Sequence, residues 1–223
     1  LIAPFALLLS LFATTGCDKG EAAPGDGGDA ADADADGDAD GRDDGEAGPD
    51  PLQCDPRSAP VALDEAPPEG ESVAGRITAA EELIDSEVPM AQVGLSWKLA
   101  NHEAAFVVQG NEVRVGYDMY GGSLLDADLQ RGAGEPGHDT FREQFSIVGW
   151  KVGGADSVSL LCDGNGGRPA VIRVEGRDQP SLILPPIDAL SPRPLNFRIV
   201  TDYILEPDTR LLRWRRCGDG GTH

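Results

Sequence analysis

Positive charge, histidine, cysteine and aromatic residues are all scarce in this chain of 223 residues, and each scarcity argues against a class of function. The 18 Lys and Arg stand against 39 Asp and Glu, which gives a net charge of −21. Because nucleic-acid binding needs a positive field, we expect no nucleic-acid partner. The three histidines, His102, His138 and His223, are too few and too widely spaced for a multi-histidine metal centre.

Motifs of the common hydrolases and nucleotide-binding proteins are also missing. The sequence contains no GxSxG, no HExxH and no phosphate-binding loop. It lacks the alternation of strands with helices of about 10–15 residues that predicts a parallel α/β sheet. We therefore assign no catalytic residue and expect no cofactor, with calcium as the one exception considered below.

The N-terminus, by contrast, has a clear pattern. Sixteen uncharged residues precede Cys17, and the apolar run 5–13 suits the core of a signal peptide but is too short to span a bilayer. With Gly16 before Cys17, the segment resembles a bacterial lipoprotein export signal. The resemblance implies a lipid on Cys17, attachment to a membrane through that anchor, and a place in the bacterial cell envelope. The chain begins without Met or a basic stretch, so we expect the natural start to lie upstream.

Residues 18–50, which we call the acidic tract, follow the cysteine directly. The tract holds eleven Asp and two Glu against one Lys and one Arg, a net charge of −11. It has no aromatic or branched aliphatic residue and cannot bury enough apolar area to offset its ordering entropy. Like charges extend such a chain. We expect a disordered linker over 18–68, with the Pro-rich residues 51–68 merging into the domain edge.

A calcium-binding loop is the alternative interpretation of part of the acidic tract. The spacing of its carboxylates resembles an EF-hand loop, although the last ligand would be Asp rather than Glu and no helix-forming segment flanks it. The candidate ligands are Asp32, Asp34, Asp36, Asp38 and Asp43. A solvated spacer is the simpler explanation, because an alternating Asp-Ala tract produces this register by chance.

Beyond residue 68 short apolar segments of period two alternate with turn residues, which predicts antiparallel strands. The expected strands are 73–77, 94–99, 104–109, 112–117, 123–129, 145–152, 157–162, 170–175, 181–184, 197–205 and 210–214. One short helix is expected at 79–85, and the glycine-rich turn 163–167 predicts a hairpin. The fold class is therefore all-β: an antiparallel β-sandwich over 69–223.

Several phrases in this region resemble a known module. They are AGRITAAEELID (74–85), WKLANHEAAFVVQG (97–110), YGGSLLDADLQ (120–130), GHDTFREQF (137–145), DGNGGRPAVIRVEGRD (163–178) and TDYILEPDTRLL (201–212). They are similar to the N-terminal β-rich region of exported myxobacterial proteins, some of which continue into CehA/McbA-like PHP metallohydrolases. The resemblance implies an extracytoplasmic sandwich. It also implies that the chain stops early, so the arginine-rich 210–216 is either a fragment end or a genuine last strand.

Two small groups of residues could form a site within the domain. Asp126 and Asp128 lie two apart in an expected strand, so they share a face at roughly 7 Å and could bind calcium or act as acid and base. His138 and Asp139 in a Gly-rich turn could orient a base. A solvated strand face and a turn cap are the simpler explanations.

Cysteines and aromatics leave further alternatives open. If Cys17 carries a lipid, Cys54, Cys162 and Cys217 remain, and export favours one disulfide with three pairings open. Trp97, Tyr117, Tyr120 and Trp150 could form a sugar-binding platform, although core packing explains them equally simply.

The sequence thus favours a membrane-anchored lipoprotein of the cell envelope that carries a non-catalytic β-sandwich. This sandwich would serve as a binding module, for an envelope protein or glycan, or as a structural support. One alternative is the truncated accessory domain of an exported PHP-type metallohydrolase. Another is a carbohydrate-binding or carbohydrate-active sandwich.

Overall fold

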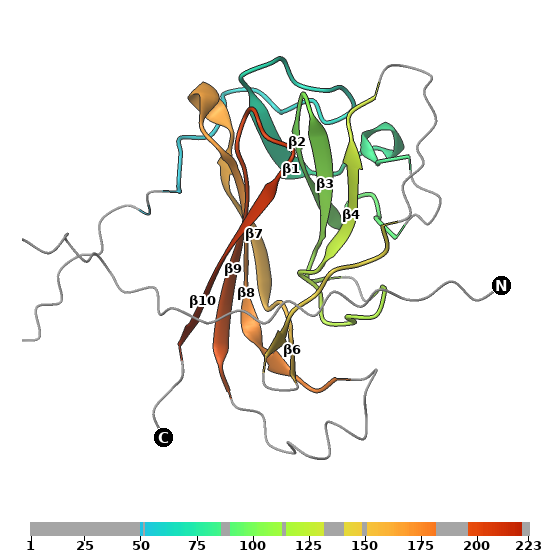
Figure 1. Cartoon of the computed structure of the whole chain (residues 1–223), viewed down its shortest axis with the longest axis vertical. Coiled ribbons are helices and arrows are strands. Elements are labelled where there is room, and N and C mark those ends of the chain that lie inside the picture. Colours follow the sequence, from blue (N-terminus) through green and yellow to red (C-terminus); the bar gives the residue numbers. More distant parts are fainter. Residues whose placement is uncertain are drawn as a thin grey trace, which may run out of the picture.

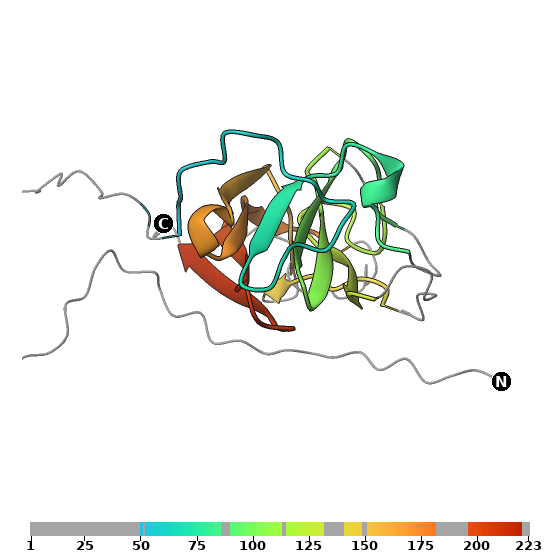
Figure 2. The same ribbon diagram turned by 90° about the horizontal axis from the view of Figure 1, so that it is seen from above.

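The computed structural model describes residues 50, 52–85, 90–112, 115–131, 141–148, 151–181 and 196–219. Regular structure in these residues is nearly all β and forms two antiparallel sheets that face each other (Figures 1 and 2). The predicted all-β antiparallel sandwich is confirmed. No helix within the described ranges is long and apolar enough to cross a membrane.

The two sheets differ in how they are assembled. The first has four strands in chain order: β1 (Ser72–Arg76), β2 (Ser96–Asn101), β3 (Ala104–Gln109) and β4 (Leu124–Leu129). The second has the order β10-β9-β8-β6-β5, with β7 also paired to β8. Its strands are β5 (Ile147–Val148), β6 (Lys151–Gly153), β7 (Ser157–Asp163), β8 (Ala170–Gln179), β9 (Arg198–Leu205) and β10 (Leu212–Asp219).

The main core lies between the sheets and is built by period-two alternation. On β8, Ile172 and Val174 point inward and are buried, whereas Arg173 lies on the opposite face and forms ion pairs there. On β9 and β10, Tyr203 and Trp214 pair directly across the strands and pack edge to face, with ring centroids 5.4 Å apart. The other buried members of this core are Ala74, Leu99, Ala104, Phe106, Val108, Leu124, Ala170 and Leu205.

Most expected strands are present, with ends that shift by a few residues; two predictions fail, and the expected strand 181–184 lies outside the described residues except for Ser181. The segment 145–152 is not one strand, because β5 and β6 pair with each other as a hairpin. The described residues of 112–117 contain a turn and a bend but no strand. Gly116 has a φ of +83°, and a Cβ there would lie 2.4 Å from the Glu143 carboxylate, so the backbone bends where a strand would have to continue.

Local turn chemistry explains the shorter elements. The expected helix at 79–85 is reduced to a single 3-10 turn, Ala80–Glu82, whose Glu82 carboxylate accepts the backbone N–H of Ala79 at 3.1 Å. The expected hairpin at 163–167 is confirmed: β7 and β8 pair across a turn that contains the 3-10 segment Asn165–Gly167. Gly164 in this turn has a φ of +85° and passes so close to the Ser72 carbonyl that no side chain would fit.

Residues 52–68, which we call the strap, cross from the outer face of one sheet to that of the other (Figure 2, blue). Leu52 and Cys54 pack beside Ile204 on the second sheet, and Leu63 packs beside Ala100 on the first. Leu63 is only 2% exposed. The sequence assigned these residues to the linker; in the structure they lie against the sandwich.

Candidate functional site

Two carboxyl side chains meet under the turn that follows β3. Glu143 reaches from the segment after β4 and accepts the backbone N–H of Tyr117, the N–H of Asp118 at 3.2 Å and the Ser123 hydroxyl at 2.9 Å. Asp118 is 1% exposed, and its carboxylate accepts the N–H of Tyr120 at 3.1 Å. The turn is therefore folded around this carboxyl pair.

Burial determines the protonation of the pair. Removal from water, helped by the nearby Glu143 carboxylate and opposed by the Tyr120 hydrogen bond, raises the pKa of Asp118 to about 7. Burial also raises the pKa of Glu143 above its ordinary range. Ionising both groups would place two negative charges in one dry site, so the pair holds a proton near neutral pH.

The opposite wall of the site comes from the second sheet. The Tyr203 hydroxyl donates to the Gly122 carbonyl at 2.7 Å, and burial raises its pKa. Arg216 on β10 donates from Nε to the Thr201 hydroxyl at 3.1 Å and also bonds the Ser146 hydroxyl. Burial lowers the pKa of this guanidinium. Acidic groups from the segments after β3 and β4 and a cation from β10 thus lie around one polar interior.

The space between these groups is very small. The cavity lined by Asp118, Ser123, Ser146, Thr201 and Tyr203 has a volume of about 20 Å³. That volume holds about one water molecule, whereas small-molecule sites span roughly 300–1,000 Å³. General acid–base catalysis requires the carboxyl to reach a substrate proton, and this cavity has no room for a substrate. The arrangement is suited to holding a proton and a water inside the fold.

Asp126 and Asp128, the strand pair singled out in the sequence, lie on the outer face of the first sheet. Asp126 is 2% exposed, and Asp128 pairs with Arg131. Neither is therefore the solvated side chain of an open strand face. β4 also carries a bulge: Leu125 has no strand partner between Val107 and Val108 of β3, and it turns to the outer face beside Val107.

The other predicted site residues fall outside the described ranges. These are the lipidation candidate Cys17, the calcium-loop candidates Asp32, Asp34, Asp36, Asp38 and Asp43, and the pair His138 and Asp139. The structure therefore does not place His138 and Asp139 relative to Asp126.

The sequence missed Asp118, Glu143, Tyr203 and Arg216, which come from four separate segments. Glu143 stands among polar neighbours in FREQF and gives no signal of burial. Tyr203 and Arg216 do follow the inward register of their strands, and that register was the one available clue.

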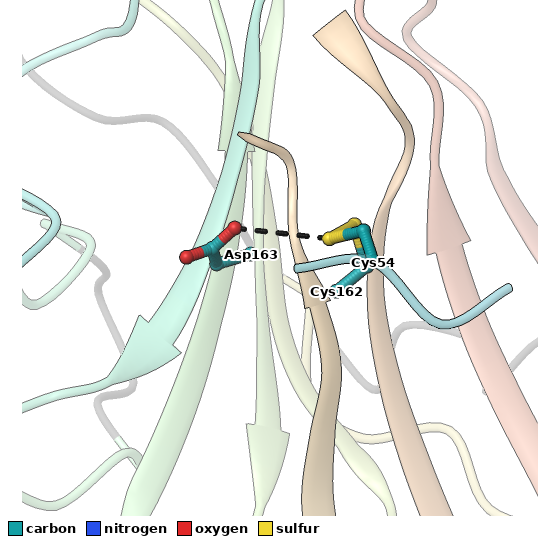
Figure 3. Close-up of side chains that lie close together, drawn as sticks. All are labelled: Cys54, Cys162 and Asp163. Atoms are coloured by element: carbon teal, nitrogen blue, oxygen red, sulfur yellow. Dashed lines mark hydrogen bonds between the residues drawn. A yellow bond between two sulfur atoms is a disulfide. The ribbon is translucent and has the colours of Figure 1, made fainter. Parts of the chain in front are cut away.

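A second cluster contains two cysteines and an aspartate (Figure 3). Cys54 and Cys162 form a disulfide with a Cα–Cα distance of 4.9 Å. Of the three pairings that the sequence left open, the structure therefore contains Cys54 with Cys162. Asp163 accepts the backbone N–H of Arg57 at 2.7 Å and that of Asn165 at 3.0 Å. Because disulfide sulfurs are not thiolates, this is a structural clamp and not a metal site.

An open groove of about 640 Å³ lies between the strap and the sandwich, lined mainly by Pro and Ala side chains. Arg57 is its one cation, and its guanidinium bonds Glu71, the Ser72 carbonyl at 3.3 Å and the Gly164 carbonyl at 3.2 Å. These contacts hold the strap in place, so Arg57 is already engaged within the fold.

The expected aromatic platform has one well-exposed member among its described residues. Tyr117 is 51% exposed, whereas Trp97 packs against the main core with Arg76 stacked over its ring. Trp150 lies outside the described residues. Comparison with protein families, with curated proteins and with solved structures finds no match to this chain.

Proposed function

We propose that this chain is a non-catalytic module of the bacterial cell envelope, held to a membrane by a lipid on Cys17 and spaced from it by the acidic tract. The disulfide between Cys54 and Cys162 is the observation that supports this most strongly. Disulfides persist in oxidising compartments outside the cytoplasm and are rare inside it. The apolar segment before Cys17 is the matching export signal.

The junction between tract and domain supports a load-bearing role. Asp50, the last residue of the acidic tract, pairs with Arg173 at 2.6 Å and with Arg215 at 3.6 Å on the second sheet. Four residues later Cys54 is bonded covalently to β7. A force applied to the tract would therefore be transmitted directly to the second sheet through Asp50 and the disulfide, and the strap that follows Cys54 would stay packed.

The polar interior supports the non-catalytic part of the proposal. Asp118 and Glu143 are the carboxyl pair with raised pKa values in the described fold, which would otherwise suggest acid–base chemistry. Asp118, the more deeply buried of the two, lines a space for about one water, which leaves no room for a substrate. We therefore expect the domain to act through its surface.

The test is attachment to membranes in a bacterial host, with a start codon and a basic segment placed before Leu1. The parent chain should enter the detergent phase on partitioning and take up labelled fatty acid, and Cys17→Ser should do neither. The double change of Cys54 and Cys162 to Ser is the matched control, since it removes two cysteines that bond each other and leaves Cys17 in place. If the parent chain and Cys17→Ser both partition into the aqueous phase, the proposal of a lipid anchor is wrong.

A further inference from the structure

The groove beneath the strap is held in place by contacts at its two ends. At one end the disulfide joins Cys54 to β7, and the Asp163 carboxylate accepts the backbone N–H of Arg57 at 2.7 Å. At the other end Leu63 packs on the first sheet, and its carbonyl accepts the Lys98 ammonium at 2.7 Å. Between these points the strap arches over the sandwich (Figure 2). The groove of about 640 Å³ is therefore preformed, and its volume is typical of ligand sites, which span roughly 300–1,000 Å³.

The backbone of the strap is unpaired along the groove. Within residues 58–66, the Leu63 carbonyl is the one backbone group that forms a hydrogen bond with another described residue. Most of these residues are exposed, and none belongs to a helix or strand. Backbone groups left outside a fold's own hydrogen bonds are the groups to which an added extended peptide binds.

The walls of the groove are apolar and built from small side chains. Val73 of β1 lies on the sandwich side, and Val61 with several Pro and Ala residues lies on the strap side. No aromatic ring is among the described residues that line the groove, so a sugar would find no surface on which to stack. Small aliphatic side chains of an extended peptide fit such walls.

Negative charge is in excess around the groove. Residues 55–71 carry five carboxylates and one arginine, and Glu71 pairs with that arginine, Arg57, at 3.4 Å. The other four carboxylates are exposed and form no ion pair with a described residue: Asp55, Asp64, Glu65 and Glu69. The buried Lys98 lies close enough to Asp64 to interact with its charge. Five carboxylates against these two cations leave an excess of three negative charges, which favours a cationic ligand.

We propose that the groove beneath the strap binds an extended, cationic peptide segment of a partner protein. Small apolar residues of the peptide lie against the groove walls, its backbone bonds the strap, and its Lys or Arg side chains lie beside the strap carboxylates. The acidic tract has the same sign of charge as the strap and is unsuited to this groove. Nucleic acids and anionic lipid headgroups are repelled for the same reason.

The inference rests on the proposed non-catalytic role, for which it names the binding surface and the class of partner. It does not depend on the lipid at Cys17. A chain that stays in the aqueous phase on detergent partitioning would leave the groove proposal intact. Failure of the peptide experiment below would likewise leave the anchor intact.

The test is the binding of fluorescein-labelled hexapeptides to the full chain at about 0.15 M salt, measured by fluorescence anisotropy. The peptide Lys-Val-Lys-Ala-Lys-Val should bind at least about tenfold more tightly than Glu-Val-Glu-Ala-Glu-Val, because the strap repels the second. A copy of the cationic peptide with N-methyl groups on alternate residues keeps its charge but loses main-chain donors. It should bind at least about threefold more weakly than the parent peptide.

Changing the strap carboxylates tests where the cationic peptide binds. The triple variant Asp64→Asn, Glu65→Gln and Glu69→Gln should weaken binding at least about fivefold, because three exposed charges beside the ligand are lost. These side chains are exposed and form no ion pair with a described residue, so the variant should fold as the parent does. The same peptide carrying a benzophenone group should crosslink to residues 56–73 of the parent chain.

A second triple variant separates the groove from the total charge. Glu112→Gln, Asp156→Asn and Glu175→Gln give the same net charge as the strap variant, and each removes a carboxylate from an ion pair outside the groove. This variant should bind the cationic peptide as tightly as the parent. Equal losses in the two variants would overturn the proposal, since binding would then reflect only the charge of the whole chain. Crosslinks confined to residues 18–50 would also overturn it, because the acidic tract would then be the binding site.

Discussion

The two sheets of this sandwich differ in how far their outer faces are covered. The first sheet is covered: the strap places Leu63 over it, and the segment between β1 and β2 adds Leu83, Ile84 and Met90 against Val107 and Leu125. The second sheet is largely bare and is crossed by arginine–carboxylate pairs. Accordingly all six residues of β3 are buried, whereas none of the first five residues of β7 is buried even though β7 pairs with β8.

The difference shows that a strand whose sheet is covered on both faces loses the alternation of apolar and polar residues along its sequence. The run AAFVVQ at 104–109 is nearly continuous in apolar residues because both of its faces pack. On β8 and β10 apolar and charged residues alternate because one face meets the core and the other meets solvent. Stability should therefore depend on apolar contacts at the first sheet, and charge effects should concentrate at the second.

The disulfide joins the strap to the second sheet and should give the largest effect. Changing Cys54 and Cys162 together to Ala removes a cross-link over 108 residues, so the free energy of unfolding should fall by about 4–5 kcal/mol. Urea denaturation measures this loss. A double variant that unfolds at the parent's urea midpoint would show that the strap is held without the bond.

The carboxyl pair between the sheets should make stability fall as pH rises. Asp118 has a pKa of about 7 in the fold against 3.8 as its ordinary value, so the folded state binds the extra proton between about pH 4 and 7. The free energy of unfolding is highest below that window and should drop across it by roughly 4 kcal/mol, at about 1.36 kcal/mol per pKa unit. Glu143, with its raised pKa, acts in the same direction.

The control for this pH dependence is Asp118→Asn, which keeps an acceptor for the Tyr120 N–H but cannot ionise. Its unfolding free energy should be much flatter between pH 4 and 8, so that it becomes the more stable protein at high pH. Thermal melts at several pH values measure both chains. Parallel curves for the two proteins would show that Asp118 is not the titrating group.

The covered face of the first sheet is tested by Leu63→Ala. Leu63 is 2% exposed where the strap packs on the first sheet, so truncation should cost about 2–4 kcal/mol through lost burial and the space left behind. Leu211→Ala is the matched control, because Leu211 is 76% exposed and its truncation should change stability by less than about 0.5 kcal/mol. Equal losses in the two variants would remove the distinction between covered and bare surface.

The bare face of the second sheet should respond least. Arg213→Ala breaks one exposed pair with Glu206, so the free energy of unfolding should change by about 0–1 kcal/mol and the change should vanish in 1 M salt. A loss of several kcal/mol that salt does not alter would mean that this face is packed rather than ionic.

Local patterns were enough to predict the fold class, the strand at 104–109 and the hairpin turn at 163–167, because each depends on neighbours in the chain. The bulge in β4 was not predictable, since the residue without a strand partner, Leu125, turns to the other face and the sequence pattern gives no sign of it. The meeting of Asp118 with Glu143 depends on how two loops cross, and the choice of Cys54 as partner for Cys162 depends on where the strap lies. Sequence spacing encodes neither arrangement.

The most direct test of the envelope proposal is the intact mass of the protein recovered from bacterial membranes. The account predicts a mature chain that begins at Cys17, carries the mass of a lipid there, and keeps Cys54 linked to Cys162 under non-reducing conditions. A water-soluble chain with an unmodified Cys17 and reduced Cys54 would contradict it.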